Sequence, residues 1–214
     1  MTIDRRRFLQ ASAAAGGGLA LEFSFPVLAA PAKGLPSTEV NAWVVIHPDD
    51  RVSIRIARSE MGQGTYTALA QLVAEELDCD WMKVSAEFAS PNEHILRKRI
   101  WGSMSTGGSQ GVRSSQDYVR KAGAAAREML VAAAAAQWKV PASECVAEKS
   151  VITHPATKRR LRYGQGASAA AKLAPPRDVK LRDPRDWKIP GKPLHRLDIP
   201  DKVMGKPVFA IDVR

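Results

Sequence analysis

Two short glycine-containing segments carry the residue types that could bind an anionic group. Residues 61–64 are Met-Gly-Gln-Gly, and residues 106–111 are Thr-Gly-Gly-Ser-Gln-Gly. Each segment precedes an expected helix, where the first backbone N–H groups are unpaired and the helix dipole is positive, which favours phosphate or another anion. Glycine allows close approach of the backbone, and Gln63, Thr106 and Ser109 add side-chain donors. The two segments are therefore candidates for an anion-binding site.

A purely structural role is the alternative for both segments. Neither matches the Walker or the dinucleotide-binding fingerprint. Each could be a glycine-containing cap that starts a helix, and on spacing alone this simpler role is favoured.

Hydrophobic periodicity predicts the elements that position these segments. Residues 41–46 and 52–57 are expected to form a hairpin about a turn at 47–50, because apolar and polar residues alternate along the second strand. A helix is expected over 65–77. Its apolar face comprises Leu69, Leu72, Val73 and Leu77, whereas Gln71, Glu75 and Glu76 are expected to face water.

The remaining pattern predicts further strands and a second long helix. In chain order we expect a strand over 81–88, a long loop over 90–113, a helix over 115–137, short strands over 145–163 and an apolar strand over 207–211. The predicted fold class is α+β, with mixed sheet hairpins packed against two main helices and an incomplete C-terminus.

Composition divides the chain into four parts. An export signal is expected over 1–32 and a globular module over 33–171. Residues 172–201 are rich in Pro, Lys, Arg and Asp, which predicts an extended linker arm. Residues 202–214 begin a further apolar segment and stop without a turn or a polar tail, so we expect a following domain to be cut off there.

The first 32 residues carry the features of an export signal in the right order. Three arginines at 5–7 precede Phe-Leu, a weakly apolar stretch follows over 11–21, and small residues over 27–32 suit signal-peptidase cleavage. The paired arginines indicate the twin-arginine route, so we expect a periplasmic protein, or one at the outer face of the cytoplasmic membrane. The alternative is a basic N-terminus followed by an alanine-rich helix.

The charge of the chain restricts its partners. The formal net charge is +10, and the expected signal contributes three Arg against Asp4 and Glu22, which leaves about +9. This excess suits an anionic membrane face, an acidic partner subunit or a polyanionic cofactor. Nucleic acid is disfavoured, because the chain is expected to be exported and its basic residues are not interleaved with aromatic residues.

Cysteine and histidine spacing supports no metal site. Cys79 and Cys145 form no CxxC motif, so two buried free thiols are favoured over one disulfide, and neither an iron–sulfur nor a zinc site is indicated. The histidines lie in predicted loops without the spacing of metal ligands and are expected at the surface. They are His47, His94, His154 and His195.

The residues around the first glycine segment resemble a known family. Residues 59–69 are Ser-Glu-Met-Gly-Gln-Gly-Thr-Tyr-Thr-Ala-Leu, followed at 72–77 by Leu-Val-Ala-Glu-Glu-Leu. They resemble the molybdopterin-binding subunits of the xanthine dehydrogenase family, and most closely the isoquinoline 1-oxidoreductase beta subunit and related periplasmic aldehyde dehydrogenases. The likeness continues through 106–109, 120–130, 191–198 and 205–214, and so covers nearly the whole chain.

The resemblance implies a cofactor site and a chemistry. It implies that residues 33–171 are the N-terminal part of a molybdopterin-binding module that holds molybdopterin cytosine dinucleotide with molybdenum. It implies hydroxylation of an aldehyde or N-heterocycle, a small 2Fe–2S iron–sulfur subunit as partner, and a c-type cytochrome or quinone as electron acceptor. The implied contacts are Met61, Gly62 and Gln63 to the pterin, and Thr106, Gly107, Gly108 and Ser109 to its pyrophosphate-bearing part.

The chain departs from the family in ending where the next domain is expected to begin. The general base of the family belongs to a later segment, and Glu60 does not occupy that role by pattern. We therefore assign no catalytic residue and expect no turnover from these residues alone. Asp198 is expected in a linker salt bridge. The alternatives are a truncated, inactive periplasmic remnant and a module that binds anions through its positive charge.

Overall fold

The computed structural model describes residues 37–212, which belong to one unit spanning 35–214. The expected export signal at 1–32 lies outside the described residues. None of the helices within the described range is long and apolar enough to cross a membrane.

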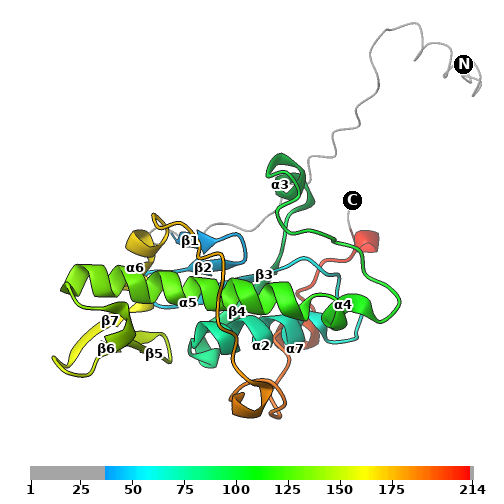
Figure 1. Ribbon diagram of the computed structural model, residues 1–214. Helices are drawn as coiled ribbons and strands as arrows, with labels where there is room; N and C mark the ends of the chain where they lie inside the picture. The colour runs from blue at the N-terminus through cyan, green and yellow to red at the C-terminus, as the bar shows by residue number, and fades with distance from the viewer. Residues whose placement is uncertain (1–36, 213–214) are drawn as a thin grey trace, which may run out of the picture. The chain divides into compact units, whose positions relative to one another are not determined.

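A four-stranded mixed sheet forms the first layer (Figure 1). Its strands, in spatial order, are β1 (Thr38–Asn41), β2 (Val44–Ile46), β3 (Val52–Ile56) and β4 (Val84–Phe88). The pairs β1–β2 and β2–β3 are antiparallel, whereas β3 and β4 are parallel. The predicted hairpin is confirmed as β2–β3, and a 3-10 turn at Trp81–Lys83 precedes β4, because the Asp80 side chain accepts the N–H of Met82 there.

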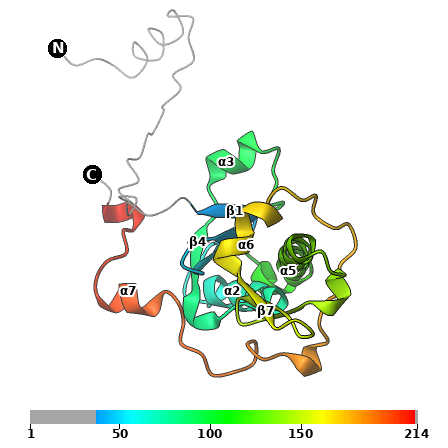
Figure 2. The same ribbon diagram turned by 90° about the vertical axis from the view of Figure 1, so that its left-hand side faces the viewer.

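Two helices pack on this sheet and on each other. Helix α2 (Thr65–Leu77) connects β3 to β4, and α5 (Gln116–Trp138) runs along it, as Figures 1 and 2 show. Both helices are confirmed, α2 at its predicted bounds and α5 within a residue at each end. A Cβ added to Gly123 of α5 would lie 2.5 Å from the carbonyl oxygen of Val73, so the two helices cross at the closest distance that glycine allows.

A second sheet and a short helix follow α5. Strands β5 (Val146–Glu148), β6 (Val151–His154) and β7 (Arg159–Arg162) form an antiparallel meander, which confirms the predicted short strands. Helix α6 (Tyr163–Ala170), which the sequence pattern did not predict, packs against α5.

The strand expected over 81–88 is formed only over Val84–Phe88, and two further predicted segments differ from the structure. The loop expected over 90–113 contains α3 (Pro91–Leu96), whose N-terminus is capped by the Ser90 side chain, and α4 (Gln110–Arg113). The strand expected over 207–211 is not formed. Helix α7 (Ile199–Val203) precedes this segment, and the Asp212 carboxylate accepts the N–H of Phe209, so that Ala210–Asp212 is a 3-10 turn.

The prediction that Glu75 and Glu76 face water is wrong. They are 2% and 0% exposed, because the arm after α6 lies over this face of α2. Glu75 Oε2 accepts the N–H groups of Lys188 at 2.9 Å and Ile189 at 2.8 Å. Glu76 accepts from the Arg120 side chain at 2.8 Å and from the backbone N–H of Arg182 at 3.1 Å. These carboxylates therefore anchor the arm to the helix.

Two histidines are buried, contrary to expectation, and both cysteines are free. His94 on α3 stacks against Trp101, and His154 on β6 contacts Thr157 and Glu144. Both imidazole rings can be buried because aromatic and polar neighbours contact them. The spacing of the histidines in the sequence does not predict these contacts. Cys79 is buried, whereas Cys145 is partly exposed rather than buried as expected.

Candidate functional site

The two glycine segments, some forty residues apart in the chain, line one cavity. Its volume is about 380 Å³. Ser59 donates its backbone N–H to Thr106 Oγ1 at 2.8 Å, and a Cβ added to Gly111 would lie 2.9 Å from Thr65 Oγ1. This close packing joins the start of α2 to α4. Of the predicted site residues, the cavity is lined by Met61, Gln63, Thr106, Gly107, Gly108 and Ser109, and Gly62 is not among its lining residues.

The first segment is built around the Glu60 carboxylate. Its Oε1 accepts the N–H groups of Gly62 at 2.7 Å and Gly64 at 2.9 Å, and its Oε2 accepts that of Tyr66 at 3.0 Å. Both glycines have positive φ, 107° and 87°, which this tight wrapping requires. The prediction of unpaired amides for an external anion is therefore wrong for this segment, because a side chain of the protein already holds that position.

Met61 and Gln63 complete the first segment. Gln63 Oε1 accepts the N–H of Met61 at 2.6 Å, and Gln63 Nε2 donates to the carbonyl oxygen of Ser59 at 2.8 Å. The Gln63 side chain thus stabilises the turn, whereas the Met61 side chain is 71% exposed. This segment offers a ligand an apolar thioether and a fixed backbone rather than free donors.

The second segment has three consecutive backbone N–H groups without an acceptor in the described part of the chain, which the first segment lacks. No acceptor for the N–H groups of Gly107, Gly108 and Ser109 is found within residues 37–212. Ser109 precedes α4 with φ 57° and makes no capping hydrogen bond through its side chain. A Cβ added to Gly107 would meet no atom within 4 Å. Open amides and a hydroxyl group therefore border the cavity on this side.

A buried arginine holds the second segment in shape. Arg58 is 5% exposed and donates to the Ser115 hydroxyl at 2.9 Å and the Ser114 hydroxyl at 3.1 Å, as well as to the carbonyl oxygen of Ser105. It forms no ion pair with any carboxylate in the described part of the chain. The second segment is therefore held by a buried cation that has no carboxylate partner among the described residues.

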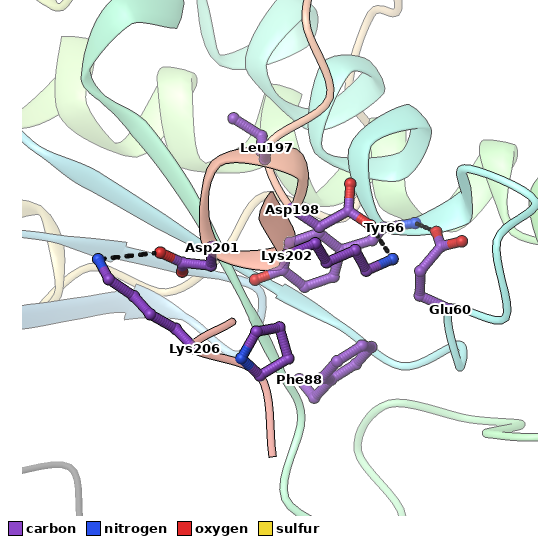
Figure 3. A pocket seen from close by; sticks show the side chains of 9 residues that line it. Glu60, Tyr66, Phe88, Leu197, Asp198, Asp201, Lys202 and Lys206 are labelled. Atoms are coloured by element: carbon purple, nitrogen blue, oxygen red, sulfur yellow. Dashed lines mark hydrogen bonds and ion pairs between the residues drawn. The ribbon is translucent and has the colours of Figure 1, made fainter. Parts of the chain in front are cut away.

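A second cavity of about 250 Å³ adjoins the first segment (Figure 3). Glu60, Tyr66 and Asp198 border it, and Asp198 is paired with Arg196 and Lys202, which confirms the predicted linker salt bridge. Burial by itself would raise the pKa of Glu60, but the three amides and Arg196 hold this pKa below its usual value. Burial raises the pKa of Tyr66 to about 12.

Comparison with known proteins identifies the family. A family profile described as the molybdopterin cofactor-binding domain matches residues 3–197. The chain belongs to this family. The open amides, hydroxyls and buried cation of the second segment fit the phosphate part of a molybdopterin cofactor, and the exposed Met61 side chain fits contact with its ring system.

Two curated proteins are similar to this chain in sequence. The chain is 32% identical over 208 residues to isoquinoline 1-oxidoreductase subunit beta of Brevundimonas diminuta, covering 81% of this chain and 27% of the relative. It is 31% identical over 227 residues to a membrane-bound aldehyde dehydrogenase (pyrroloquinoline-quinone) of Gluconacetobacter polyoxogenes, covering 100% of this chain and 28% of the relative. The chain thus spans little more than a quarter of the length of these relatives.

A solved structure of a Cu,Mo-CO dehydrogenase is also similar to the molybdopterin-binding domain. The identity is 22% and the TM-score 0.42, over 59% of this chain and 15% of that one. The α+β fold itself follows from the two sheets and the helices that pack on them.

Sequence reasoning missed Arg58, and it named Glu60 only to exclude it as a general base. Arg58 and Glu60 flank Ser59 directly before the first glycine segment; Arg58 is buried, and the Glu60 side chain is 5% exposed. A signal was present, since opposite charges beside a glycine turn at the start of a helix suggest capping. Because the Glu60 carboxylate is occupied by backbone amides, it is not free to act as a base, and we assign no catalytic residue to residues 37–212.

Proposed function

We propose that this chain is the N-terminal portion of the molybdenum-cofactor-binding large subunit of an oxidoreductase that hydroxylates aldehydes or N-heterocycles with oxygen derived from water. The proposal rests on the family assignment, on the names of the relatives, and on the way both glycine segments line a single cavity. The last of these observations carries it, since residues far apart in the chain border a single cavity.

The residues of this chain bind and orient the cofactor. The amides of Gly107, Gly108 and Ser109, in a segment held by Arg58, would hold its phosphate part, and Met61 would contact the pterin. When bound, the molybdenum cofactor supplies the two-electron oxidation of the substrate carbon. The general base lies outside the described residues in this proposal.

We propose four finer features by resemblance. The cofactor is molybdopterin cytosine dinucleotide, and the subunit pairs with a small 2Fe–2S iron–sulfur protein, in keeping with the word "subunit" in the name of a relative. Electrons pass to a c-type cytochrome. The protein is exported through the twin-arginine pathway to the periplasm, where it can associate with the outer face of the cytoplasmic membrane; the arginines at 5–7 support this.

The test uses the protein at its native length, captured from its host with an antibody against residues 187–200. We expect stoichiometric molybdenum by elemental analysis, release of cytidine monophosphate by acid hydrolysis, and dye reduction with aldehydes or N-heterocycles. Fractionation of the periplasm tests the localisation. Release of guanosine monophosphate, or of no nucleotide, would overturn only the proposal that the cofactor is the cytosine dinucleotide.

A matched pair of variants links the activity to the cavity. Gly107→Leu places a side chain in space where an added Cβ meets nothing, so the fold is expected to survive while molybdenum and activity fall at least tenfold. Ala156→Leu, in the exposed turn between β6 and β7, serves as the control. Native protein without molybdenum or pterin would overturn the proposal, and phosphate-dependent stabilisation in such protein would favour the anion-binding module.

A further inference from the structure

The end of the arm reaches back to the first glycine segment. Arg196 donates through Nη1 to the carbonyl oxygen of Gly62 at 2.8 Å and lies 3.1 Å from Glu60 Oε1 through Nη2. The next residue, Leu197, donates its backbone N–H to Thr67 Oγ1 at 3.0 Å. A segment 130 residues away in the chain is thereby fastened to the turn and to the first helical residues of α2.

Arg196 is itself held in place by a second carboxylate. Its Nε and Nη2 donate to Asp198 at 2.9 Å and 2.6 Å, and Lys202 donates to the same carboxylate at 2.6 Å. We call Glu60, Arg196 and Asp198 the clasp. Asp198 fixes the guanidinium, the guanidinium meets Glu60 and Gly62, and Glu60 accepts three amides of the turn, so that the arm and the turn form one network.

A second arginine on the arm shows that an ion pair with a nearby aspartate does not by itself connect the arm to the turn. Arg185 donates to Asp183 through Nε at 3.0 Å and Nη2 at 2.7 Å, two residues away in the chain, as Arg196 does to Asp198. Arg185 is 88% exposed in its side chain and makes no other ion pair in the described range, whereas Arg196 is 30% exposed and bridges to Glu60. Only the Arg196–Asp198 pair is connected to the first glycine segment.

We propose that Arg196 is a positioning residue for the cofactor: through Glu60 and Gly62 it fixes residues 61–63 against the cofactor cavity. This rests on the proposed function. The clasp residues are not among those that line the cofactor cavity, whereas Glu60 and Asp198 line the adjoining cavity (Figure 3). The clasp therefore acts on the ligand through Met61 and the backbone and not by contact. The arm thereby completes the site that α2 begins.

The test compares Arg196→Met with Arg185→Met in the native-length protein. Hydrogen–deuterium exchange at the amides of Gly62, Gly64 and Tyr66 is expected to rise about tenfold in Arg196→Met, with α5 unchanged, because the turn opens locally. Arg185→Met is expected to match the wild type within about twofold. Arg196→Lys keeps the charge but not the fork of donors, and intermediate exchange is expected.

Pterin content per folded chain is the second readout, since a merely structural residue would not change it at equal thermal stability. A fall of about tenfold in Arg196→Met together with local loosening supports the proposal. Unchanged exchange, exchange raised throughout the domain, or normal pterin content overturns the positioning role alone. Wild-type protein without pterin overturns the proposed function, and the positioning role with it.

Discussion

The two glycine segments look alike in sequence but are built in opposite ways. The first wraps its amides around the Glu60 carboxylate, whereas the second is braced from behind by the Arg58 guanidinium and leaves its amides open. These charged residues are separated by one position in the chain. Each nevertheless organises a different segment.

This difference decides what each segment offers to an anion. An anion near residues 61–64 would meet a carboxylate that already occupies the helix N-terminus, whereas an anion near 107–109 would meet unpaired donors in a segment held by a buried cation. A glycine-rich segment before a helix therefore indicates an anion site only when no side chain of the protein holds that position.

The largest effect is expected from Gly123→Ala, which removes the scaffold that both segments share. A Cβ at this position lies 2.5 Å from the Val73 carbonyl oxygen and 3.1 Å from Glu76 Cβ, so α5 must move away from α2. We expect a loss of about 3 kcal/mol or more in the free energy of unfolding, measured by urea denaturation. Gly107→Ala is the control and should change this value by less than about 0.5 kcal/mol. Equal stability of the two variants would contradict the close crossing.

Arg58→Met is expected to disrupt the conformation of the second segment and to leave that of the first unchanged. The buried Ser115 hydroxyl, the Ser114 hydroxyl and a carbonyl oxygen lose their donor, which should cost about 2–3 kcal/mol of unfolding free energy and abolish stabilisation by phosphate or pyrophosphate. Thermal unfolding in phosphate and in chloride at equal ionic strength measures both effects. Arg113→Met, on the exposed face of α4, is the control. If phosphate still stabilised the Arg58→Met variant, the Arg58 charge would not be what distinguishes the second segment from the first.

Glu60→Gln is expected to weaken the first segment with a defined dependence on pH. The pKa of Glu60 is lowered in the folded protein, so its charge contributes stability above the unfolded value of about 4.3, and this contribution is lost as pH falls through the folded pKa. At pH 7 we expect a loss of about 1–2 kcal/mol, measured by urea denaturation. Wild type and variant should converge towards pH 3. Glu148→Gln, at an exposed position, is the control, and a difference that stays constant with pH would contradict a role for the Glu60 charge.

The smallest change in stability is expected from Ser109→Gly, which separates binding from folding. Glycine relieves the positive φ of 57°, so the unfolding free energy should stay equal or rise by about 0.5 kcal/mol, whereas loss of the hydroxyl should weaken pyrophosphate binding about fivefold. Isothermal titration calorimetry measures the binding. Lys158→Gly, with φ 56° in a turn of the second sheet, relieves the same strain and should leave binding unchanged. Unaltered affinity in Ser109→Gly would show that this hydroxyl does not face the anion.

The sequence by itself determined the main elements and the family. Sequence patterns located β2, β3, α2, α5 and the meander, and periodicity was clearest for α2 and α5, whose apolar residues recur at helical spacing. The resemblance of residues 59–69 to a known family implied molybdopterin binding, which the family assignment confirms. Local patterns suffice here because they depend on residues close together in the chain.

Only the tertiary structure decided which charged side chains are buried and which partners they have. Glu75 and Glu76 looked solvent-exposed on the pattern of α2, yet the arm covers them with backbone N–H groups and Arg182. Residues 207–211 looked like a strand, yet no strand pairs with them in the described range. Burial of a carboxylate requires partners from elsewhere in the chain, and Arg196 lies more than 130 residues from Glu60, so neither the arm anchor nor the clasp could be read from spacing.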